Sequence, residues 1–189
     1  MTVRDVSFGT YVDTNGSPGP ISRLSLDILP LDLVVQWRRC GQTADYVAAF
    51  LAYHFGDFGR AMNILSTVVN ELVENSVKFS SNKRHLLRLG ALFYGDTMIL
   101  ETTNSISEEQ VITFSSFIKR LLDGNLDDIF IQQVEHSAEY DVVLTGLGLL
   151  SLKRDYASGM GVRIRTESSS SLHEVTVQLQ LDIDSFEDD

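Results

Sequence analysis

The segment 70–80 contains residue types and spacings that phosphate chemistry uses. Glu71 stands four residues before Asn75, and Lys78 follows three residues later. On a helix, these three side chains project from one face. The carboxylate of Glu71 can take a proton from an attacking hydroxyl or water, and the amide oxygen of Asn75 is a hard ligand suited to Mg²⁺. Taken alone, the same pattern also fits the ordinary solvated face of a helix.

A second segment, Thr145-Gly-Leu-Gly148, has the character of a phosphate-binding loop. Gly146 and Gly148 open an apolar run that is predicted to be helical. Glycine lets backbone N–H groups approach an anion closely, and the start of a helix carries a partial positive charge. Two glycines before a helix also occur in simple tight turns, so this segment alone leaves both interpretations open.

The hydrophobic pattern predicts the elements that must position these two segments. Positions 61–79 are apolar on one side and polar on the other with a helical period, which predicts a long amphipathic helix. A shorter helix is predicted to open near Gly41 and Thr43, and its recurring face contains Tyr46, Val47, Phe50, Leu51 and His54. Strands are predicted at 23–29, 33–37, 85–94, 97–103, 162–167 and 175–183, and 3–12 is either an edge strand or a loose segment.

The stretch between these strands, 105–145, is predicted to be partly helical. Ser107 and Gln110 have the spacing of a capping box at the start of a helix, and Gly124 suits its C-terminal end. A second short helix is predicted at 126–134. The apolar side of these helices must be buried against the domain itself, a partner protein or a second copy of the chain.

Glu-x-x-x-Asn on a helix, followed later by Gly-Leu-Gly-Leu, resembles the GHKL ATPase superfamily. The resemblance runs from about residue 24 to about residue 183 and is strongest to the anti-sigma factor serine kinases, including the SiaB-type bacterial regulators. It implies an α/β (α+β) two-layer sandwich, the Bergerat ATP-binding fold, in which helices cover one face of a mixed, mainly antiparallel sheet. We therefore expect one domain over 1–189, with an N-terminal extension at 1–22 and a lid at 105–145.

The resemblance also assigns roles to individual residues, with ATP and Mg²⁺ as cofactors. It implies that Glu71 orients or deprotonates the attacking hydroxyl, and that Asn75 holds Mg²⁺. The residues expected to contact nucleotide are Asn75, Lys78, Asn104, Thr145, Gly146, Leu147 and Gly148. Asn104 stands where the family places the aspartate of an Asp-x-Gly-x-Gly motif that this chain lacks. Its side-chain oxygen can still accept a hydrogen bond from an adenine amino group.

By this resemblance the protein is predicted to be a serine/threonine protein kinase in a partner-switching pathway. Its substrate would be a small STAS-type antagonist protein. One alternative is a binding module that grips nucleotide, or none, and sequesters a partner without chemistry. Another is a catalytic piece that serves a separate histidine phosphoacceptor. A homodimer is compatible with each of these predictions.

Composition limits the classes of partner. The chain has 189 residues, 43% of them hydrophobic, which is enough for one well-buried domain. Its formal net charge of −11 disfavours binding to nucleic acid or to an anionic membrane through a broad surface. We find no apolar run long enough to span a membrane and no signal-peptide core. The single cysteine, Cys40, excludes an internal disulfide and is typical of a cytoplasmic protein.

Overall fold

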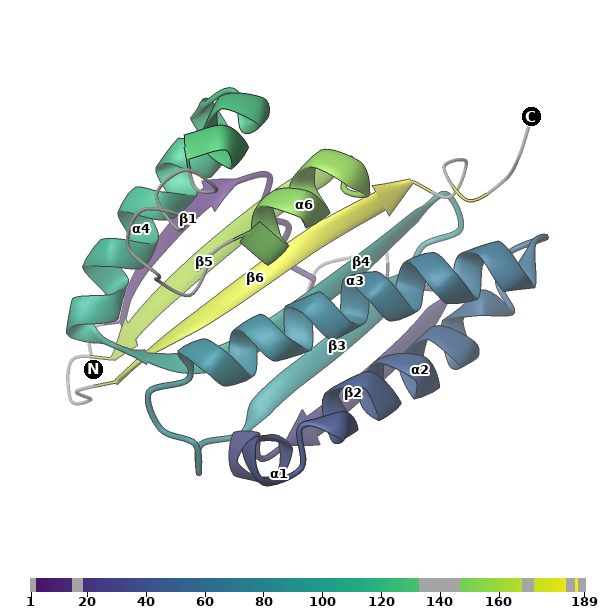
Figure 1. The fold of residues 1–189 in the computed structure, drawn as a ribbon, viewed down its shortest axis with the longest axis horizontal. Coiled ribbons are helices and arrows are strands. Elements are labelled where there is room, and N and C mark those ends of the chain that lie inside the picture. The colour runs from purple at the N-terminus through teal and green to yellow at the C-terminus, as the bar shows by residue number, and fades with distance from the viewer. Residues whose placement is uncertain (1–2, 15–18, 133–146, 168–171, 183–185, 187–189) are drawn as a thin grey trace.

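A six-stranded antiparallel sheet forms the base of the fold, and the helices of the described residues lie on one face of it (Figure 1). The computed structural model describes residues 3–14, 19–132, 147–167, 172–182 and 186. The strand order is β1-β5-β6-β4-β3-β2, and each neighbouring pair is antiparallel. The strands are β1 Val3–Gly9, β2 Ser22–Ile28, β3 Leu87–Phe93, β4 Thr97–Ser107, β5 Gly159–Glu167 and β6 Leu172–Asp182. The predicted two-layer α+β sandwich is confirmed.

Two long helices pack against each other on the sheet, with one of them lying over β4 and β3. They are α2 (Arg38–Ala52) and α3 (Phe58–Phe79), and α3 is the long amphipathic helix that the sequence predicts. The buried side of α3 includes Leu65, Val68 and Leu72, which supply most of the apolar contact with the sheet and α2.

The ends of α3 are held by two side chains. The carboxylate of Asp57 accepts a hydrogen bond of 3.0 Å from the backbone N–H of Arg60. Lys83 donates to the final carbonyls, including that of Ser80 at 2.7 Å. Because both ends are held, the positions of side chains along α3 are well defined.

The prediction of a strand at 33–37 is wrong. The structure has a short helix there, α1 (Pro30–Val35), and Trp37 is the N-cap residue of α2. Proline at the first helical position needs no N–H partner and has a φ value suited to a helix. Only Pro30 and Leu33 of α1 are buried, which is a helical rather than an alternating pattern.

The prediction for α2 was also partly wrong. The helix begins at Arg38, before the predicted start near Gly41. Val47 and Leu51 are buried as expected, but Tyr46 and Phe50, from the same predicted apolar face, are exposed. Helix α2 packs mainly against α3, and the side chains of Tyr46 and Phe50 lie outside that contact.

The predicted hairpin is confirmed, with one change that matters for the site. Strands β3 and β4 are joined by a turn in which Gly95 has a φ of 103°, a conformation that favours glycine.

Strand β4 continues to Ser107, so Asn104 lies inside the strand rather than at its end. Its side chain therefore has a fixed place on the helix-covered face of the sheet, alternating with neighbours that face the other way.

The remaining helices flank α3. They are α4 (Glu108–Asp123) and α6 (Leu147–Asp155). The predicted capping box is present, since the Ser107 hydroxyl and the Gln110 side chain each accept from the other residue's backbone N–H. Gly124 is the C-cap, as predicted. The second short helix is seen at 126–132, and the rest of its predicted span lies outside the described residues.

On the opposite face of the sheet, the chain after β1 lies directly on β5 and β6. The side-chain amide of Gln178 bonds both the N–H and the carbonyl of Val12, at 2.9 and 3.1 Å. A Cβ on Gly161 would lie 2.3 Å from the Cα of Tyr11, so only glycine allows this approach. No helix within the described ranges is both long enough and apolar enough to cross a membrane.

Candidate functional site

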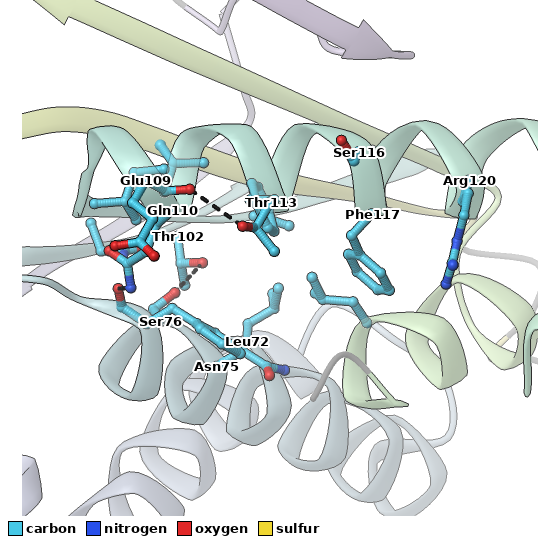
Figure 2. Close-up of a pocket in the computed structure, with 17 residues that line it drawn as sticks. Leu72, Asn75, Ser76, Thr102, Glu109, Gln110, Thr113, Ser116, Phe117 and Arg120 are labelled. Atoms are coloured by element: carbon cyan, nitrogen blue, oxygen red, sulfur yellow. Dashed lines mark hydrogen bonds between the residues drawn. The ribbon is translucent and has the colours of Figure 1, made fainter. Parts of the chain in front are cut away.

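A cavity of about 600 Å³ lies between α3, α4 and the sheet (Figure 2). Its walls combine apolar side chains with polar groups, as is usual for sites that bind small molecules. The apolar lining residues are Leu72, Phe79, Ile106, Phe114, Phe117, Leu149, Val175 and Val177. The polar ones are Asn75, Ser76, Thr102, Asn104, Glu109, Gln110, Thr113, Ser116 and Arg120.

The first turn of α6 lies directly against the polar side chains of α3. A Cβ placed on Gly148 would lie 2.2 Å from the Glu71 Oε2 atom and 2.7 Å from the Asn75 Nδ2 atom. Any other residue would push these two side chains aside. The structure thus brings Gly148 beside Glu71 and Asn75, although it lies 73 positions after Asn75 and 77 after Glu71 in the sequence.

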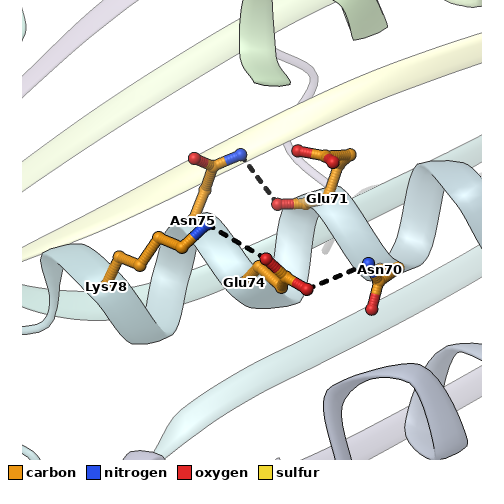
Figure 3. Close-up of polar contacts among 5 residues, drawn as sticks. All are labelled: Asn70, Glu71, Glu74, Asn75 and Lys78. Carbon is orange, nitrogen blue, oxygen red and sulfur yellow. Dashed lines mark hydrogen bonds and ion pairs between the residues drawn. The ribbon is translucent and has the colours of Figure 1, made fainter. Parts of the chain in front are cut away.

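Within this group, the orientation of Asn75 leaves its oxygen available. Its Nδ2 atom donates a hydrogen bond of 2.7 Å to the backbone carbonyl of Glu71 (Figure 3). The Oδ1 atom is thereby directed away from the helix backbone, and it is a suitable donor for Mg²⁺. A carboxylate and an amide oxygen of this placement fit a magnesium–phosphate group, and Gly148 is the residue that lets the start of α6 lie against them.

The environment of Glu71 changes its acidity. Burial raises the pKa of the Glu71 carboxyl above its usual range, and the negative charge of Glu74 raises it further, while Lys78 acts in the opposite direction. A carboxylate with a raised pKa is a better proton acceptor near neutral pH than an ordinary surface glutamate. This is the property that a general base requires.

Lys78 is paired with Glu74 on the same helix. Its ammonium group lies 3.0 Å from the Glu74 Oε2 atom (Figure 3). It also lies 5.5 Å from the centre of the Trp37 ring. The amide of Asn70 also bonds Glu74, at 3.2 Å. The three predicted residues of one helix face are therefore divided: two face α6, and Lys78 faces the side of α2.

The floor of the cavity contains a buried polar group that sequence analysis only partly identified. Asn104 is 5% exposed, and its Nδ2 atom donates a long hydrogen bond of 3.5 Å to the Ser105 carbonyl. Beside it, the Ser76 hydroxyl donates to the Thr102 hydroxyl at 2.8 Å. Sequence analysis missed Ser76 because it lies among the apolar residues of α3. Thr102 could have been found, because it lies two residues before Asn104 on β4 and therefore faces the same side of the sheet as Asn104.

One end of α4 is fixed to the rest of the domain by several side chains. The Gln110 Nε2 atom donates to the carbonyl of Phe79 at 3.1 Å, which joins α4 to the end of α3. The buried His173 lies 2.7 Å from both the Glu108 Oε2 and the Thr166 Oγ1 atoms. The sequence indicated Gln110 only as a cap, because a link between two helices depends on their packing.

Two predicted site residues, Thr145 and Gly146, lie outside the described residues. Leu147 is partly buried and packs against the hydrophobic core, so in this structure its side chain contributes apolar packing. Within the described part of the chain, no cluster of three or more histidine, cysteine, aspartate or glutamate residues has a metal-binding arrangement. Any metal here would be held by few protein ligands together with phosphate oxygens, as is common for Mg²⁺.

Comparison with known proteins supports the fold. No protein-family model matches the sequence, and no curated protein matches it either. Among solved structures, the chain is similar to one in the crystal structure of the SiaB-SiaC complex from Pseudomonas aeruginosa, with a TM-score of 0.60 and 11% identity. The match covers 84% of this chain and 89% of that chain. The likeness supports the expected SiaB-like fold, whereas membership of the GHKL superfamily stays a prediction.

Proposed function

We propose that this protein is an ATP-dependent signalling regulator that phosphorylates a serine or threonine of a small partner protein. The observation that carries the proposal is the contact of Gly148 with Glu71 and Asn75 beside the cavity of about 600 Å³. This arrangement places a proton acceptor and a magnesium ligand together at the start of α6, and Asn75 also lines the cavity. The cavity beside it has room for a nucleoside between apolar walls.

In this proposal each described residue has a defined task. Asn75 holds Mg²⁺ through its Oδ1 atom, and the polar floor at Asn104 and Thr102 recognises the base. Glu71 accepts the proton of the partner's hydroxyl, which its raised pKa favours. Bound ATP would supply the phosphoryl group, and bound Mg²⁺ would offset its negative charge.

The partner is proposed from the structural neighbour. The similar chain belongs to a complex of two proteins, SiaB and SiaC. We propose that the present chain likewise acts on a small regulatory protein of the STAS type.

Titration calorimetry with ATP and Mg²⁺ tests the nucleotide site. We expect binding that requires Mg²⁺ and that weakens at least tenfold in Asn75→Ala. An absence of binding by the wild-type protein at millimolar ATP would overturn the proposal. For the chemistry, Glu71→Ala should abolish phosphate transfer to a purified STAS-type partner while leaving its binding intact.

A second candidate function is a binding module without catalysis. The observation that favours it is the aromatic and aliphatic surface of α1 and α2, where Val35 is 70% and Tyr53 is 80% exposed. Large exposed apolar patches of this kind often bind proteins. In this case Glu71→Ala would change neither partner binding nor the regulatory effect, which distinguishes the two functions.

A further inference from the structure

The cavity has two chemically different ends along α4. In Figure 2, Glu109 and Gln110 lie at one end, near Ser76 and Thr102, and Phe117 and Arg120 lie at the other. The first end contains amide and hydroxyl groups. The second contains a guanidinium group from the last turn of α4, close to α6.

The guanidinium of Arg120 is available to a ligand. In the described part of the chain its side chain forms no hydrogen bond or ion pair. Basic residues near it have other contacts. Lys119, the preceding residue, lies 6.0 Å from the ring centre of Phe8, and Arg154 is paired with Asp155 at 2.7 Å. Arg120 is also the one basic residue among those that line the cavity.

Electrostatics gives this side chain a specific role. The chain carries a formal net charge of −11, the carboxylate of Glu71 lies beside Gly148, and that of Glu109 lines the cavity. A polyphosphate entering such a site needs positive charge that the protein supplies beyond any bound Mg²⁺. Arginine presents five donors in a planar fork that matches phosphate oxygens, and it stays protonated at all relevant pH values.

We propose that Arg120 binds the phosphate chain of the nucleotide and makes the site selective for polyphosphorylated nucleotides over nucleosides. The inference rests on the proposed nucleotide site. It adds that helix α4, which is fixed at its Gln110 end, contributes the phosphate-binding cation from its other end. The base would then lie toward Asn104, and the phosphates would lie between Arg120 and the start of α6.

Calorimetric titration of ATP, ADP and adenosine into four proteins tests this assignment. The proteins are the wild type, Arg120→Ala, Arg120→Lys and the control Lys119→Ala, which removes an exposed charge from the neighbouring position. We expect Arg120→Ala to weaken ATP and ADP binding about tenfold to a hundredfold while adenosine affinity changes less than about twofold. Arg120→Lys should give an intermediate loss, because it keeps the charge but not the fork, and Lys119→Ala should bind as the wild type does.

Three results would overturn the inference. Equal ATP affinity in the wild type and Arg120→Ala would refute it while leaving the proposed nucleotide site intact. An equal loss of ATP and adenosine affinity would show that Arg120 shapes the cavity rather than binding phosphate. If the wild type binds none of the three ligands, the proposed function fails together with the inference. Arg120 is exposed, so circular dichroism of the variants should match the wild type.

Discussion

Replacing Gly148 with alanine separates the role of this residue in folding from its role at the site. The added Cβ would lie 2.2 Å from the Glu71 Oε2 atom and 2.7 Å from the Asn75 Nδ2 atom. Both atoms are at the ends of flexible side chains, which can rotate away. Off-rotamer conformations of the two side chains cost about 0.5–1.5 kcal/mol each. Alanine offsets up to about 1 kcal/mol of this cost through its higher helix propensity.

These opposing effects leave a net loss of unfolding free energy of about 2 kcal/mol or less. The displaced amide and carboxylate, in contrast, no longer lie where Mg²⁺ and phosphate are expected. We therefore predict a loss of ATP–Mg²⁺ affinity of at least tenfold, or about 1.4 kcal/mol. Urea denaturation measures the first quantity, and calorimetry measures the second on the same samples.

Gly59→Ala is a matched control, because Gly59 is the second residue of α3 just as Gly148 is the second residue of α6. A Cβ on Gly59 would have its nearest contact 3.6 Å away, at Asp57 Oδ1, which is ordinary packing. This variant should be as stable as the wild type or slightly more so, with unchanged ATP affinity. Gly148→Ala that binds ATP–Mg²⁺ within twofold of the wild type would refute the reasoning about the site. A stability loss well above 2 kcal/mol would show that the side chains cannot rotate away.

Two further predictions concern buried polar groups. Burial raises the pKa of Glu71 above its ordinary value of 4.5, so the ionised carboxylate lowers the stability of the folded state. This loss of stability disappears as the pH falls through the raised pKa toward 4.5, because the carboxyl group then becomes protonated. Urea midpoints should therefore show Glu71→Gln to be more stable than the wild type at pH 8, with the difference shrinking toward pH 4.5; a constant difference would contradict this. Ser76→Ala should cost about 1–3 kcal/mol of unfolding free energy because it leaves the Thr102 hydroxyl without its 2.8 Å partner. Ser76→Ala combined with Thr102→Val should recover most of that loss, and additive losses in the denaturation curves would argue against the pairing.

Local patterns were sufficient to predict the elements that carry the site. The helical period of 61–79, the Ser107–Gln110 capping box and the alternation of the later strands each depend on neighbouring residues in the sequence. The same rules failed at 33–37, where Leu33-Val-Val resembles a strand although Pro30 begins a helix. A short run of β-branched residues does not specify whether it will pair with another strand or pack as a helix.

The composition of the cavity could not be predicted in the same way. Glu71, Asn75 and Gly148 were found because their spacing resembles a known motif. No sequence pattern singles out Arg120, because its place in the cavity depends on how α4 lies beside α3 and α6. Lys78 shows the reverse case, because its spacing suggested the site but Glu74 and Trp37 hold it elsewhere.

The pairing of β1 with β5 has a consequence for how the chain folds. Gly9 pairs with Gly161, so the first strand of the sequence cannot join the sheet until the fifth has formed. During synthesis on the ribosome, residues 3–9 must wait until most of the chain has been made. Contacts of such long sequence separation slow folding and expose an unpaired edge in the meantime. Pulse-labelling hydrogen exchange should therefore find the amides of β1 among the last to gain protection.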